Sequence, residues 1–149
     1  MGGILSNNAS GMCCGVVNNS YHTTRSIRFI LPDGKSFNTA EKPDYNRFES
    51  ECKDLFSEIA TIRKEILSNN LLLEKIRSKY QTKNTVGYSL NALVDYEHPL
   101  DILAHLLIGA EGTLAFIAEA VMETIADHPF KSTALLYFPT VYAACQAIV

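Results

Sequence analysis

The stretch that most constrains the fold is a glycine-bounded turn near residue 110. An apolar run with helical spacing stops at Gly109, and Gly112 follows three residues later, on the other side of a single acid, Glu111. Glycine adopts positive φ angles without strain and lets other groups approach the backbone closely. A long apolar segment then leaves the turn. This pattern predicts a tight turn between two buried elements, with a backbone that a ligand can reach.

The composition is typical of one globular domain. Of the 149 residues, 47% are hydrophobic and 19% are charged, which is enough apolar material for a packed core. The net charge of −3 and the scattered Lys and Arg residues give no electrostatic footprint for nucleic acid. No apolar run reaches the length of a transmembrane helix, and no signal-peptide pattern opens the chain. We expect one domain over residues 1–149, located in the cytoplasm, with no nucleic-acid partner and no transmembrane segment.

Cysteine and histidine usage gives no pattern for a metal or for disulfides. The four cysteines include an adjacent pair, Cys13 and Cys14, but no Cys-x-x-Cys pair. His98 and His105 are seven positions apart, and no third ligand stands at a matching spacing. We therefore predict no metal site and a reducing compartment.

A β-hairpin is predicted early in the chain. The run from Ser26 to Leu31 is rich in β-formers, Pro32-Asp33-Gly34 is a strong turn signal, and Lys35 to Phe37 returns as a short strand. Near the other end, Ser132 to Phe138 is another β-rich run. These segments predict the strands of a small sheet.

Helical patterns fill the middle of the chain. Apolar residues recur every three or four positions from Phe48 to Ile66, with Asp44 as the expected N-cap and Pro43 just ahead of it. A second helix is predicted from Leu71 to Tyr80, and a third from Pro99 to Gly109. The apolar stripes of these helices are interpreted as core.

Two segments near the C-terminus carry further expectations. Thr140 is the expected cap of a final helix from Val141 to Ile148. The segment from Leu114 to Ile125 is ambiguous, because its residues are good helix formers and its apolar positions alternate only partly. Residue patterns alone leave helix and strand open there.

The N-terminal run from Gly2 to Gly15 is small, polar and rich in glycine. Such a run buries little side chain, whereas consecutive N–H groups in a turn can form an anion-binding nest. Composition alone favours a flexible tail. The first six residues also fit a myristoylation pattern, although a glycine pair that serves a backbone turn is the preferred interpretation.

Three segments together resemble the FAD-linked oxidases, the flavoproteins with a para-cresol methylhydroxylase-type FAD-binding domain that include D-lactate and D-2-hydroxyglutarate dehydrogenases. Gly2 to Gly11 resembles the family's "GGxxxxNASG" segment, Asn84 to Leu90 its "NTxGYxL" element, and Ile108 to Leu114 its "IGxEGTL" signature. The three occur in family order and are specific only in combination. The resemblance favours a ligand loop over a tail at the N-terminus, and a strand over a helix after Leu114.

The resemblance also implies which residues contact FAD. In flavin dehydrogenases the flavin performs the redox step, and the protein supplies position and electrostatics. For Glu111 we prefer a role in anchoring the turn to one as acid or base, and we interpret Tyr88 as a packed loop residue. No catalytic residue is assigned. A Cβ at Gly11 or Gly112 is expected to strain a positive-φ backbone or to enter the cofactor's space. The implied cofactor-binding residues are Gly2, Gly3, Asn8, Ala9, Ser10, Gly11, Ser20, Tyr21, Glu111, Gly112, Leu114 and Ile117.

The implied fold is α+β, a small and mainly antiparallel sheet covered by helices, which forms the second half of an FAD-binding domain. In the family an earlier flavin subdomain precedes this half and a substrate-binding cap follows it. The expected partners are therefore FAD and the remaining domains of a parent enzyme. Surface left exposed without them favours self-association; it is expected near Ile4 and Leu5 or near Val149.

The leading hypothesis for function is a fragment of an FAD-dependent oxidoreductase that oxidises a D-2-hydroxy acid, as D-lactate dehydrogenase does. The isolated chain is expected to be inactive, because without the partner subdomain and the cap neither cofactor nor substrate is fully enclosed. FAD is expected in the full-length parent, and whether this fragment alone holds it is left open. The alternative is a non-enzymatic α+β module without a cofactor, whose glycine-rich segments are ordinary turns.

Overall fold

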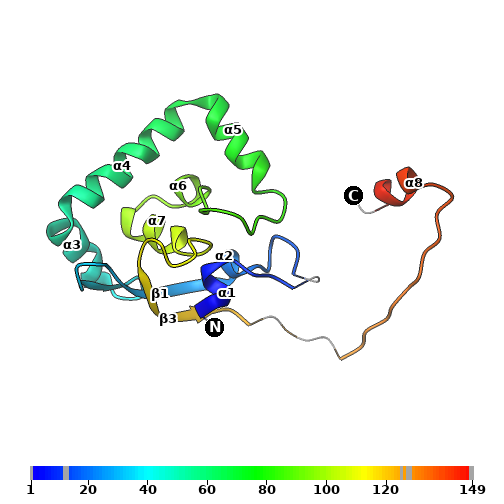
Figure 1. The fold of residues 1–149 in the computed structure, drawn as a ribbon, viewed down its shortest axis with the longest axis horizontal. Coiled ribbons are helices and arrows are strands. Elements are labelled where there is room, and N and C mark those ends of the chain that lie inside the picture. Colours follow the sequence, from blue (N-terminus) through cyan, green and yellow to red (C-terminus); the bar gives the residue numbers. More distant parts are fainter. Residues whose placement is uncertain (1, 12–13, 125, 127–128, 148–149) are drawn as a thin grey trace.

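A computed structural model describes residues 2–11, 14–124, 126 and 129–147 of the chain. Its long helices form an arc over a small sheet, and two shorter helices, α6 and α7, lie between the arc and the sheet (Figure 1). The elements in chain order are α1 (Gly2–Ser6), α2 (Ser20–Thr23), β1 (Thr24–Ile30), β2 (Ser36–Asn38), α3 (Lys42–Glu51), α4 (Lys53–Ser68), α5 (Asn70–Lys79), α6 (Ala92–Asp95), α7 (Pro99–Leu106), β3 (Phe116–Met122) and α8 (Val141–Gln146).

The three strands form an antiparallel sheet in the order β2-β1-β3, which confirms the α+β class and the predicted hairpin. Phe29 of β1 lies opposite Phe37 of β2, and Ile27 lies opposite Ala120 of β3. The strand predicted after Leu114 is confirmed as β3 within the described residues. Pairing with β1 supplies hydrogen-bond partners to that backbone, and this tertiary contact outweighs its helix-forming composition.

The core lies between the sheet and the helices. Phe29, Phe37 and Phe48 are fully buried, and the rings of Phe37 and Phe48 pack edge to face with centroids 5.2 Å apart. Most of α7 is buried, including Leu100 and Ile102, so this helix passes through the centre of the molecule. The turn that follows α7 is thereby held by the best-packed part of the fold.

The helix predicted from Asp44 to Ile66 is divided in two. Cys52, with φ −126° and ψ 44°, breaks it between α3 and α4. The expected capping role of Asp44 is wrong, because α3 starts two residues earlier. The Asp44 carboxylate instead accepts the Asn38 N–H at 2.8 Å and pairs with Arg47 at 2.6 Å. It therefore joins the end of β2 to the helix.

The N-terminal segment begins with a helix, whereas a glycine-rich loop was predicted there. Its first residues form the short helix α1, which was not predicted. Leu5 is buried in the body of the protein, and Ile4 is half-exposed. Burial of Leu5 removes apolar surface from water, which favours docking of the segment over a free tail.

The strand predicted from Ser132 to Phe138 is wrong. Residues 130–138 have no regular secondary structure and run away from the body, towards α8 (Figure 1). A strand needs a partner for its backbone groups, and no described strand lies beside this run. The cap of the final helix is confirmed, since Thr140 Oγ1 accepts the Ala143 N–H at 3.2 Å, while the predicted end at Ile148 lies outside the described residues.

Candidate functional site

Two of the three family-like segments meet at the turn after α7. The Gly109 N–H donates to the Leu5 carbonyl at 3.0 Å, and the Glu111 N–H donates to the Ser6 carbonyl at 2.8 Å. The carbonyls at the end of α1, which have no partner within that helix, thus receive donors from the turn. These hydrogen bonds hold the N-terminal segment and the glycine-bounded turn together.

The third segment, Asn84 to Leu90, joins them at the same place. Asn8 Nδ2 donates to the Asn84 carbonyl at 3.3 Å, and Ser89 Oγ donates to the Ile108 carbonyl at 2.7 Å. Ser89 is buried, so its hydrogen bond is shielded from water. All three segments that carry the resemblance therefore converge, although they are far apart in the sequence.

Tyr88 closes this junction from the solvent side. Its hydroxyl lies 2.9 Å from Thr113 Oγ1, and Thr113 Oγ1 itself donates to the Ala110 carbonyl at 2.6 Å. A hydroxyl has one proton to donate, so Tyr88 is the donor to Thr113. Tyr88 packs on the turn and keeps 43% of its surface exposed.

The backbone of the turn explains the glycines. Gly109 has φ +93° and Gly112 has φ +73°, as expected for Gly112, and Glu111 between them has φ +52°. The Glu111 carboxylate is exposed and bonds to no residue that the structure describes, so the residue anchors the turn through its N–H alone. At Gly11 the expectation of a positive φ is wrong; an added Cβ there would lie 3.6 Å from Cys14 Sγ, an ordinary contact.

A groove runs along β3 and the start of α1. One hollow of about 580 Å³ is lined by Gly2, Leu5 and the β3 side from Ile117 onward. A second hollow of about 290 Å³ shares Gly2 and Ile117 with the first and adds Gly112. An added Cβ at Gly2 or Gly112 would meet no atom within 4 Å, so the backbone at both positions faces open space. The groove thus brings together three of the predicted cofactor-binding residues.

The acidic side chains along this groove are neutralised by arginines from β1. Glu119 pairs with Arg28 at 2.9 Å, and Glu123 pairs with Arg25. The pairs are exposed, so their contribution to stability is small. They do reduce the negative potential that the two carboxylates would otherwise present to an anionic ligand.

Three other predicted residues do not line the groove. Asn8, Ser20 and Tyr21 are buried. Asn8 Oδ1 accepts the Tyr21 N–H at 3.1 Å, and Ser20 Oγ donates to the Ala9 carbonyl at 3.1 Å. These residues fix the path of the N-terminal segment, while Gly3 is exposed on α1.

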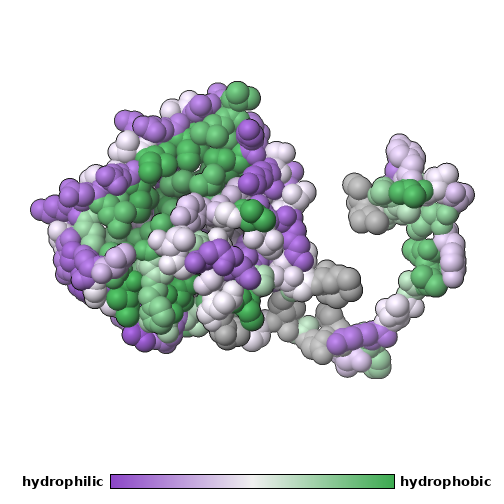
Figure 2. Space-filling model, in the orientation of Figure 1, coloured by the Kyte–Doolittle hydropathy of each residue, from purple (hydrophilic) through white to green (hydrophobic). Residues whose placement is uncertain are grey.

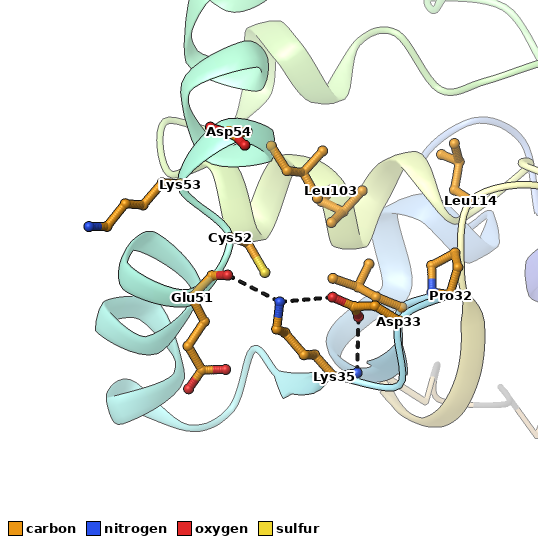
Figure 3. Close-up of a pocket in the computed structure, with 11 residues that line it drawn as sticks. Pro32, Asp33, Lys35, Glu51, Cys52, Lys53, Asp54, Leu103 and Leu114 are labelled. Carbon is orange, nitrogen blue, oxygen red and sulfur yellow. Dashed lines mark hydrogen bonds and ion pairs between the residues drawn. The ribbon is translucent and has the colours of Figure 1, made fainter.

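Leu114 lines a different cavity, of about 500 Å³ (Figure 3). Lys35 Nζ crosses it, 2.8 Å from Asp33 Oδ2 and 3.2 Å from the Glu51 carbonyl. Cys52 lies on the side opposite Leu114, and burial raises the pKa of its thiol, which keeps the thiol protonated. The structure therefore separates Leu114 from the groove that holds Gly2, Gly112 and Ile117.

Tyr21 is the centre of a buried polar cluster. Its hydroxyl donates to Asp95 Oδ2 at 2.8 Å, and burial followed by the Asp95 charge raises its pKa above the ordinary range. The His105 ring packs edge-on against Tyr21 and stacks on Tyr96 with centroids 3.8 Å apart. Nδ1 of His105 lies 2.8 Å from the Asp101 carbonyl, so Nδ1 carries the proton, and the buried Nε2 has no partner among the described residues.

Stability is expected to fall in mild acid because of His105. Burial lowers the pKa of His105 below its ordinary value of 6.5, because a charged ring would lose its solvation. As the pH falls, the unfolded chain therefore binds a proton at this histidine before the folded chain does. The contribution of neutral His105 to the free energy of unfolding is complete above about pH 6.5. It is lost as the pH falls towards the folded-state pKa, by up to about 1.4 kcal/mol per pH unit. Urea unfolding at pH 5 to 8 measures this slope. His105→Phe keeps an aromatic ring and is expected to make the free energy of unfolding depend less on pH. Equal slopes in His105→Phe and wild type would exclude His105 as the cause.

Sequence reasoning missed the residues that tie the segments together. Lys83 donates to the carbonyls of Ser10 and Gly11, and Ser89 bonds to Ile108. Both lie in or beside the "NTxGYxL"-like element, which is the signal that was available. Their partners are backbone carbonyls, whose positions only the fold defines.

Comparisons with protein-family models, curated proteins and solved structures gave no match to this chain. The family resemblance therefore stays a prediction from its three motifs. In the described part of the chain, no group of three or more His, Cys, Asp or Glu residues is arranged to hold a metal ion. No helix in that part combines the length and apolarity needed to cross a membrane.

Proposed function

We propose that the chain forms one half of an FAD site in an FAD-dependent oxidoreductase that oxidises a D-2-hydroxy acid. The observation that supports this most is the convergence of the three motif-bearing segments beside one groove. Gly2, Gly112 and Ile117 line the groove, and Asn8, which does not line it, bonds to the "NTxGYxL"-like loop. A flavin site built from these three segments requires them to lie together, as they do here.

Two features of the groove support the proposal of an extended cofactor. Its two hollows adjoin through shared residues, and its glycine backbone leaves room for close approach. When bound, the flavin would accept the hydride from the substrate. This chain would supply Gly2, Gly112 and Ile117 as a wall that binds and orients the cofactor and excludes water on one side. We assign no proton-accepting group to it.

The partners in this proposal are the remaining domains of the parent enzyme. They would cover the groove and bring the substrate, in the cytoplasm, where thiols such as Cys14 and Cys52 stay free. Without them, exposed apolar surface favours self-association. Leu5 is buried and Val149 lies outside the described residues, so we place the contact on residues 130–142, whose exposed apolar side chains are visible in Figure 2.

The alternative function is a non-enzymatic module without a cofactor. Its support is that hydrogen bonds and steric needs within the fold already account for Gly109, which approaches the Gly87 carbonyl closely. Gly112 also needs glycine for its φ of +73°, but its added Cβ would meet no atom within 4 Å, so a side chain there would affect a ligand in the groove and not the packing of the fold. Gly112 is therefore the position at which the two functions make different predictions.

We expect saturable FAD binding by the chain, and a loss of at least about tenfold in affinity in Gly112→Val. The valine would project into the groove, and its positive φ adds strain of roughly 1–3 kcal/mol. FAD affinity is measured by quenching of flavin fluorescence, beside a thermal melt of each variant.

Gly34→Val is the matched control for this experiment. Gly34 has φ +87° in the turn between β1 and β2, and its added Cβ also meets nothing. It should destabilise the fold to a similar extent and leave FAD affinity unchanged. Equal affinity in wild type and Gly112→Val, or no FAD binding by wild type, would reject the flavin site in favour of the cofactor-free module.

A further inference from the structure

Strand β3 is an edge strand of the sheet. The strand order is β2-β1-β3, so β3 pairs with β1 on one side only. Apart from this pairing, the Glu123 N–H donates to the Thr23 carbonyl, and no other backbone hydrogen bond joins residues 116–124 to a residue that the structure describes. The backbone groups on the outer side of β3 are therefore available to another strand.

The groove described above lies along this outer side. Its larger hollow, of about 580 Å³, is lined by consecutive residues from Ile117 to Ala120 and from Met122 to Thr124. Successive side chains of a strand point to opposite faces of the sheet, so a hollow lined by consecutive residues follows the edge of the strand. A neighbouring strand would lie about 4.7–4.9 Å from β3, within this groove.

A bulge limits how much of the edge is regular. Ala118 has no partner in β1, whereas Ile117 and Glu119 pair with the adjacent residues Phe29 and Arg28. A bulge of this kind disrupts the hydrogen-bond ladder locally. We therefore place regular pairing on residues 119–124, which we call the β3 edge.

Residues 132–138 have the composition of a strand and no partner. The run Ser-Thr-Ala-Leu-Leu-Tyr-Phe contains no charged residue, proline or glycine. It has no regular secondary structure and makes no backbone hydrogen bond to a described residue. In an extended chain Leu135 and Tyr137 share one face, and Leu136 and Phe138 share the other. Both faces are apolar, as in a strand that is covered on both sides.

We propose that residues 132–138 of one chain add as a strand to the β3 edge of a second copy, so that two chains form a symmetric dimer. Within one chain the segment runs away from the sheet, which leaves the β3 edge of that chain open (Figure 1). Each copy thus offers one edge and one segment, and two copies satisfy both reciprocally about a twofold axis. In strand addition the backbone hydrogen bonds provide the affinity.

The charges on β3 are compatible with this occupant. The segment is uncharged, while Glu119 pairs with Arg28 and Glu123 pairs with Arg25. The added strand would fill the groove proposed for FAD, so the dimer and the cofactor exclude each other; this consequence alone rests on the proposed function. FAD titrations at protein concentrations below the dissociation constant of the dimer test that function separately.

The test removes backbone donors and keeps apolar side chains. Adjacent N–H groups of a strand point to opposite edges, so Leu135→Pro/Leu136→Pro removes a donor to β3 in every register. The dissociation constant of the dimer, measured by sedimentation equilibrium, should rise at least about tenfold. Leu135→Val/Leu136→Val keeps apolar, strand-forming residues and should stay within about threefold of wild type. Both residues lie outside regular structure, so the thermal melt of the body should not change.

Hydrogen exchange identifies the surface that receives the segment. As the protein concentration rises, the amides of residues 132–138 should become protected together with those amides of residues 119–124 that face away from β1. The amides of α4 should exchange at the same rate at all concentrations, because this helix lies outside the proposed contact.

Several outcomes would overturn the proposal. A wild-type chain that stays monomeric would do so, as would equal dissociation constants in the proline and valine variants, because backbone pairing would then contribute nothing. Protection of residues 132–138 without protection of the β3 edge would place the contact elsewhere. Protection of both segments at every concentration would mean that the segment fills the edge of its own chain.

Discussion

Replacing Gly109 with alanine is expected to lower the free energy of unfolding by about 2–4 kcal/mol. Two costs add at this position. The residue has φ +93°, a conformation in which a Cβ is strained. The added Cβ would also lie 3.2 Å from the Gly87 carbonyl oxygen, a backbone atom that cannot rotate away. Because Asn8 lies beside the same point, the change also disturbs the junction of all three motif-bearing segments.

Gly34→Ala separates the two costs. Gly34 has a similar angle, φ +87°, but its added Cβ meets no atom within 4 Å. Gly34→Ala should therefore lower the free energy of unfolding only by the backbone strain, about 1 kcal/mol. Urea unfolding of both variants, followed by circular dichroism, gives the difference directly. A loss in Gly109→Ala no larger than that in Gly34→Ala would show that the contact with Gly87 is relieved without cost.

The elements that sequence reasoning predicted correctly are those with local causes. The hairpin follows from Asp33 and Gly34, because only glycine adopts the φ of +87° without strain in that turn. The start of α7 follows from Pro99 in its first turn and from His98, whose Nδ1 accepts the Leu100 N–H at 3.1 Å. These signals act within a few residues, so the sequence alone contains them.

The strands required information from distant parts of the chain. Phe116–Met122 has the composition of a helix, yet it pairs with β1 and becomes a strand. Ser132 to Phe138 has the composition of a strand, yet it has no partner and forms none. The two segments differ in the neighbour that the fold provides, and residue preferences do not contain that difference.

The site was predictable to the extent that it depends on backbone shape. Gly112 could be identified because a glycine beside an acid in a turn suggests a positive φ. The burial of Ser20 and Tyr21 could not be predicted. Both are polar residues in a polar stretch, and their burial depends on the contacts of α2 with α1 and α6. Lys83 could not be identified either, since its partners are two carbonyls that become neighbours only in the folded chain.

The segment from Phe130 to Tyr142 has the exposed surface of an interaction site. Leu135 is 78% exposed and Tyr137 is 87% exposed, and several neighbours are similar. Apolar patches of this kind favour association, since burial of each large side chain contributes about 1.5–3 kcal/mol. Self-association of the chain through this segment follows as the expected behaviour.

Replacing Leu135 and Leu136 together with serine is expected to raise the dissociation constant of this self-association about a hundredfold or more. Sedimentation equilibrium over a range of concentrations measures it. The matched control replaces Leu71 and Val86, which are 83% and 79% exposed on the body of the protein, with serine. If exposure alone caused association, both double variants would become monomeric to the same extent. A wild-type chain that stays monomeric at high concentration would refute the assignment altogether, because the apolar side chains of residues 130–142 would then be tolerated in water without a partner.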